Sequence, residues 1–84
     1  MKHAGAAALD QLDALLAEIR ALGGAVEKAR GVFYRRGRAF LHFHEDPRGL
    51  FADLRGPGDP DFVRFDVTDE AGRAALVEAV RSRL

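Results

Sequence analysis

The length, composition and charge of this chain exclude several classes of protein. Its 84 residues allow a single domain, and thirteen basic residues balance thirteen acidic ones, so no overall field attracts nucleic acid or a membrane. It has no cysteine, which excludes disulfides, thiol catalysis and thiolate zinc sites. No apolar run resembles a signal peptide or a membrane span, and we therefore expect a cytoplasmic protein.

The first predicted element is a helix from about Ala6 to Leu22. Its apolar side chains recur at spacings of three and four residues: Leu9, Leu12, Leu16 and Ile19. Gly23 and Gly24 then favour the end of the helix, because glycine readily adopts the left-handed conformation found at helix C-termini. Residues 25–30 are ambiguous and leave open a short extended lead-in to the next element.

Runs of β-branched and aromatic residues follow, separated by turn sequences. They predict strands at residues 31–35, 38–44, 49–55 and 62–67. Arg36-Gly37 and residues 45–48 predict tight turns, and the proline- and glycine-rich residues 56–61 predict an exposed loop. Thr68 is the predicted N-cap of a second helix that carries its apolar stripe to Leu84.

This order, α-β-β-β-β-α, predicts a two-layer α+β sandwich. An antiparallel sheet of four or five strands would carry both terminal helices on one face. Because side chains alternate along a strand, small and aliphatic residues should face the helices: Ala39, Leu41, Phe43, Leu50, Ala52, Leu54, Val63, Phe65 and Val67. The opposite, open face would collect aromatic, imidazole and charged groups: Tyr34, Phe40, His42, His44, Phe51, Asp53, Arg55, Phe62, Arg64 and Asp66.

The open face is the predicted functional surface. We expect a small non-catalytic binding or interaction domain, with these contact residues: Tyr34, Phe40, His42, His44, Phe51, Arg55 and Arg64. Self-association is the simplest use of an exposed aromatic face, since such patches tend to be covered by partners, and a two-fold dimer is the common form. Another protein partner is the other possibility.

His42 and His44 suggest an alternative function. Alternate residues on a strand share a face, so both imidazoles could approach one zinc or iron ion, with Asp53 or Asp66 as a third ligand. The competing interpretation is that each histidine packs as a half-buried ring against neighbouring aromatic side chains and that no cofactor is bound. The sequence leaves both open.

A third hypothesis concerns five basic residues close together in the sequence: Lys28, Arg30, Arg35, Arg36 and Arg38. Beside aromatic side chains, such a patch could bind nucleic acid or an anionic ligand. The neutral net charge argues against nucleic acid, and arginines at a hairpin also protect a sheet edge from aggregation.

Most catalytic signatures are missing. The sequence has no glycine-rich phosphate loop and no Gly-x-Ser-x-Gly, and its only side-chain aliphatic hydroxyls are those of Thr68 and Ser82. Glu45 and Asp46 lie in a predicted turn, where neither carboxylate would be desolvated, and we assign them no catalytic role.

The segment from Val32 to Arg55 resembles one in short bacterial proteins that share Phe-Leu-His-Phe-His-Glu-Asp followed by Gly-Leu-Phe-Ala-Asp. More distantly, the order of elements is similar to that of the YjbR/MmcQ family, which implies a frataxin (CyaY)-like fold and, for some members, DNA binding. This chain is shorter, with a reduced loop before its last strand, and it lacks the acidic helix ridge of frataxins. The resemblance therefore transfers neither iron binding nor DNA binding to particular residues.

Overall fold

Six strands and three helices follow one another along the chain, which the computed structural model describes from residue 1 to residue 84. In chain order they are β1 (Lys2–His3), α1 (Ala6–Gln11), α2 (Asp13–Leu22), β2 (Val26–Ala29), β3 (Val32–Arg35), β4 (Arg38–Asp46), β5 (Gly49–Leu54), β6 (Val63–Asp66) and α3 (Glu70–Arg83). The four predicted strands and the second helix are all present. Two strands are additional: β2, which the sequence left ambiguous, and the two-residue β1.

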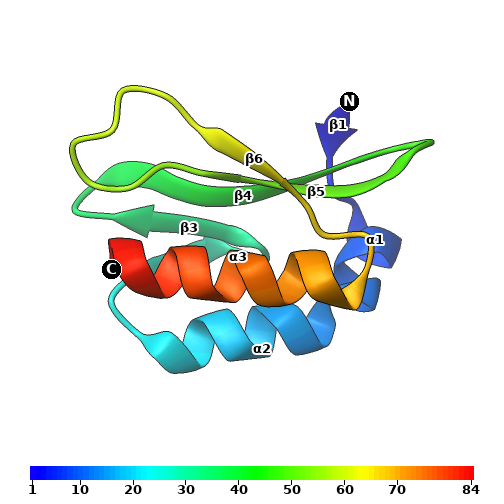
Figure 1. Cartoon of the computed structure of the whole chain (residues 1–84), viewed down its shortest axis with the longest axis horizontal. Coiled ribbons are helices and arrows are strands. Elements are labelled where there is room, and N and C mark those ends of the chain that lie inside the picture. Colours follow the sequence, from blue (N-terminus) through cyan, green and yellow to red (C-terminus); the bar gives the residue numbers. More distant parts are fainter.

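The strands form one antiparallel sheet in the order β2-β3-β4-β5-β6, and β1 pairs with β4. Figure 1 shows α3 packed beneath this sheet with α2 beside it. A single cluster of sixteen buried apolar residues joins the two layers, with Leu16, Leu41, Leu54, Leu76 and Val80 fully buried in it. The structure thus confirms the α+β sandwich. No helix is long and apolar enough to cross a lipid bilayer.

The N-terminal helical region differs from the prediction because it consists of two helices that meet at Leu12. The backbone of Leu12 leaves the helical conformation (φ −95°, ψ 9°), and its N–H lies within hydrogen-bond distance of two carbonyl oxygens, those of Ala8 and Leu9. Its side chain is fully buried. The spacing of the apolar residues was therefore correct about which side chains enter the core but did not reveal the break.

The start of α3 also differs from the prediction by one residue. Asp69 is the N-cap, and its Oδ1 accepts a hydrogen bond from the Gly72 N–H at 2.9 Å. The Thr68 hydroxyl instead bonds to the backbone of Leu50, accepting from its N–H at 3.1 Å. Thr68 thus ties the end of the sheet to the start of the helix.

A β-bulge in β4 overturns the predicted positions of Ala39 and Phe40. Phe33 pairs with Leu41 whereas Tyr34 pairs with Ala39, so Phe40 is an extra residue on its strand. The alternation of side chains is interrupted at a bulge. Ala39 therefore shares the face of Tyr34 instead of the helix side, and Phe40, predicted to be a contact residue, is only 1% exposed and belongs to the core.

Val63 is a further departure, since it was expected in the core and is 48% exposed. It is the first residue of β6, which is the edge strand of the sheet, and only one neighbouring strand covers it. Leu54, its partner on β5, is fully buried between two strands.

Candidate metal centre

The two histidines of β4 lie on the same face of the sheet, as their spacing predicted. His42 pairs with Asp53 and His44 pairs with Phe51 on the neighbouring strand β5. Both imidazoles are partly buried, and their ring centroids are 4.8 Å apart in an edge-to-face arrangement.

His3 completes a group of three imidazoles. It lies on β1 directly opposite His44, and the centroids of these two rings are 4.7 Å apart. Each of the three histidines offers one ring nitrogen to a set whose members all lie within 4.8 Å of one another. The chain contains three histidines, and all of them are in this group. Sequence reasoning did not assign His3 to the site, because a two-residue strand has no periodicity to detect.

Backbone and carboxylate contacts hold β1 in place beside β4. The Ala4 N–H donates to the Phe43 carbonyl at 3.0 Å, and the Gly5 N–H donates to Glu45 Oε2 at 2.6 Å. The Lys2 ammonium lies 4.0 Å from the same carboxylate. Glu45 was predicted to be a solvated turn residue. It instead lies within β4, and its carboxylate orders the segment that carries His3.

Several ring nitrogens of the group have no hydrogen-bond partner although they are buried: Nδ1 of His42 and both Nδ1 and Nε2 of His44. Asp53 Oδ2 is 3.2 Å from His44 Nε2 without forming a hydrogen bond to it. Buried polar atoms are nearly always paired, and leaving one unpaired costs on the order of 1–3 kcal/mol. These nitrogens are therefore free to coordinate an ion.

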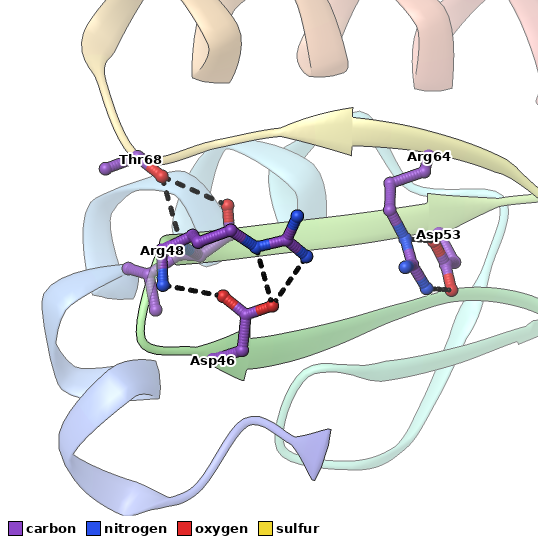
Figure 2. A network of polar contacts seen from close by, with 6 residues as sticks. Asp46, Arg48, Asp53, Arg64 and Thr68 are labelled. Carbon is purple, nitrogen blue, oxygen red and sulfur yellow. Dashed lines mark hydrogen bonds and ion pairs between the residues drawn. The ribbon is translucent and has the colours of Figure 1, made fainter. Parts of the chain in front are cut away.

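Asp53, predicted as the third metal ligand, belongs to a different interaction. Arg64 reaches from β6 to Asp53 on β5 and donates two hydrogen bonds, Nε to Oδ1 and a terminal nitrogen to Oδ2, both at 2.7 Å (Figure 2). This contact lowers the pKa of the Asp53 carboxyl, which is 7% exposed. Asp53 thus supplies a fixed negative charge beside the imidazoles, and the structure does not bring it into the group of three.

Burial lowers the pKa of His42, and repulsion from His44 lowers it further. Its ring is therefore neutral at neutral pH, the form in which imidazole coordinates metal. Phe62 contributes to this environment, because its ring meets that of His42 edge to face with centroids 4.7 Å apart.

Guanidinium groups lie over two of the aromatic rings on this face. Arg55 is stacked on Phe62 at 4.4 Å from the ring centroid, and Arg48 lies 5.8 Å from that of Phe51. The Asp46 carboxylate accepts hydrogen bonds from the backbone N–H and from the guanidinium group of Arg48 (Figure 2). The large apolar residues that are exposed are Met1, Val26 and Val63.

The predicted basic patch is divided among separate parts of the structure. Arg30 pairs with Asp10 and Asp13 near α1, and the Lys28 ammonium lies over the Tyr34 ring at 4.1 Å. The remaining members, Arg35, Arg36 and Arg38, lie at the opposite end of β3 from Arg30 and line a cavity. The five residues therefore do not form one surface, because the two turns of the β2-β3-β4 meander are at opposite ends of β3.

Comparison of the chain with protein-family models, with curated proteins and with solved structures found no match. The resemblance to YjbR/MmcQ proteins and to the short bacterial proteins therefore gains no support from these comparisons and stays a prediction.

Proposed function

We propose that the protein binds a divalent transition-metal ion, zinc(II) in particular, through His3, His42 and His44. The observation that carries the proposal is the convergence of three imidazoles, with buried ring nitrogens that form no hydrogen bond. Three neutral imidazoles are a common ligand set for zinc, and a fourth position would be open to water or a ligand.

The donor set favours zinc over iron. Non-haem iron sites typically combine two histidines with a carboxylate, and the nearest carboxylate, that of Asp53, is held by both of its oxygens in the ion pair with Arg64. Nitrogens bound to tetrahedral zinc are about 3.4 Å apart, given Zn–N bonds of about 2.05 Å. Rotation of the side chains on metal binding would reduce the present separations of up to 4.8 Å to that value.

Metal binding is better supported than the self-association predicted for this face. That prediction required an exposed aromatic surface, and the rings of Phe51 and Phe62 are instead partly buried with guanidinium groups over them. A second copy would meet a largely polar surface here, which offers little apolar area for a dimer.

The test is a zinc titration of tag-free protein, stripped with a chelator, followed by calorimetry and by NMR of the imidazole nitrogens. We expect one equivalent to bind with a Kd of about 1 μM or lower, equivalent to about 8 kcal/mol. The signals of His3, His42 and His44 should shift together and saturate at the same ratio. Cobalt(II) should give the intense visible absorption of a tetrahedral site.

Single alanine substitutions at each histidine should weaken zinc binding by about tenfold or more. Glu18→Gln, which removes an exposed carboxylate on α2, is the matched control and should leave the affinity unchanged. Weak and independent shifts of the three rings, or an affinity that His3→Ala does not alter, would contradict the proposal.

A further inference from the structure

A second polar site lies at one end of the sheet, between the β3–β4 turn and the loop that follows β5. It is a partly enclosed cavity of about 190 Å³, lined by Arg35, Arg36, Arg38 and Arg55 together with residues 56–58. No carboxylate lines it. Four arginines line this small volume, and an anion between them would reduce the repulsion among their positive charges.

The distribution of ion pairs over the chain makes this cavity exceptional. Of the eleven arginines, six lie within 4.0 Å of a carboxylate oxygen: Arg20, Arg30, Arg48, Arg64, Arg81 and Arg83. A seventh, Arg73, donates to the carbonyl groups of Val67 and Thr68. The other four line the cavity, and of these Arg55 donates to the Ala39 carbonyl at 3.3 and 3.1 Å. Four of the five arginines without an acidic partner therefore line one cavity.

Two of the four arginines have unfavourable features that a bound anion would explain. Arg36 is the only residue other than glycine with a positive φ, 53°, a conformation that costs an arginine about 1 kcal/mol or more. Asparagine or glycine would form the same turn with Gly37 at lower cost. Arg35 Nε is buried and has no hydrogen-bond partner, although its terminal nitrogen donates to the Gly24 carbonyl at 3.0 Å.

We propose that this cavity binds the phosphate or diphosphate group of a small molecule. Guanidinium groups donate paired hydrogen bonds that match phosphate oxygens, and several around one group neutralise its charge. The volume is below the roughly 300–1,000 Å³ of sites that enclose a drug-sized ligand, so it suits the anionic group more than a whole cofactor. A nucleic-acid strand would need a basic groove beyond the cavity, and the neighbouring arginines Arg64 and Arg83 are paired with acids.

The test is calorimetric titration of chelator-treated protein with inorganic phosphate and with pyrophosphate at low salt. We expect saturable binding of at least one of the two anions, tighter for pyrophosphate, with a Kd that rises with salt concentration. The Nε–H signal of Arg35 should shift during the titration. Removal of the metal keeps this result independent of the histidine group, and His42→Ala should bind the anion as the wild type does.

Arg36→Gly is the decisive variant, because it relieves the left-handed conformation and should leave the fold at least as stable while weakening anion binding about tenfold. Arg38→Ala should weaken binding similarly. Arg81→Ala removes the same charge from α3, where Arg81 pairs with Glu78, and should have little effect. Equal losses in Arg36→Gly and Arg81→Ala, no saturable binding of either anion, or binding of single-stranded DNA without pyrophosphate binding would overturn the proposal.

Discussion

His3 and His44 lie directly opposite each other on paired strands, although they come from opposite halves of the chain. The pairing places a third imidazole over the two that β4 already presents. Because β1 has only two residues, the position of His3 depends on the few contacts that hold this strand, and the Glu45 carboxylate makes two of them.

Glu45→Ala should therefore weaken zinc binding without unfolding the protein. Loss of the carboxylate frees the Gly5 N–H and the Lys2 ammonium, and β1 should then separate more readily from β4. We expect the affinity for zinc to fall by about tenfold, the usual effect of removing a group that orients a metal ligand. Calorimetry measures the affinity, and amide hydrogen exchange at Ala4 and Gly5 measures the loosening of the strand.

Glu45→Gln is the matched control, since its amide oxygen can still accept from the Gly5 N–H. It should retain most of the affinity. An equal loss in Glu45→Gln and Glu45→Ala would show that charge, and not the hydrogen bond, governs the position of His3.

The metal-free protein should lose stability as the pH falls below about 6.5, the pKa of histidine in an unfolded chain. The folded-state pKa of His42 is lowered by burial. As the pH falls, His42 is therefore protonated first in the unfolded chain, and this protonation stabilises the unfolded state relative to the folded state. Urea unfolding at intervals between pH 7.5 and pH 5 should show this decline. His42→Gln should show a shallower decline, and an unchanged slope would rule out a neutral, buried His42.

Asp53 should stabilise the fold through its ion pair with Arg64 at neutral pH. We expect Asp53→Asn to cost about 1 kcal/mol, because it removes a charge-assisted pair of hydrogen bonds from a buried position. The folded-state pKa of Asp53 is lowered, so its contribution is complete above the unfolded value of about 3.9 and is lost as the pH falls through the folded value. The difference between wild type and variant should shrink in acid.

Arg64→Ala should be compared with Asp53→Asn, because it removes the other member of the ion pair. It leaves the buried carboxylate of Asp53 without its guanidinium partner, so it should destabilise the fold more than Asp53→Asn does at neutral pH. The opposite order in urea unfolding would mean that Arg64 contributes little to holding Asp53.

Gly72→Ala should destabilise the protein although Gly72 lies inside α3. Helix propensity alone predicts a gain of about 1 kcal/mol for this change. A methyl group at this position would overlap the backbone carbonyl oxygen of Asp66, and we expect a net loss of about 2 kcal/mol. Ala75→Gly, at an exposed position of the same helix, should cost about 1 kcal/mol by propensity. Thermal unfolding of the two variants compares these effects, and a more stable Gly72→Ala protein would contradict the close contact.

The sequence by itself determined the elements with a strong period. Leucines spaced by three and four residues predicted the helical region, and alternation along 38–44 and 49–55 placed His42, His44 and Asp53 on one face. These patterns are local, since each follows from the repeat of a helix or a strand within a few residues. The fold class followed from their order.

Only the tertiary structure decided which residues form the candidate site. It brought His3 beside His44 and held Asp53 in the ion pair with Arg64. It also buried Phe40 at a bulge, where the alternation that predicted its exposure no longer applies. Strand pairing, ion pairing and bulges depend on the register between segments distant in sequence, and no local repeat encodes that register.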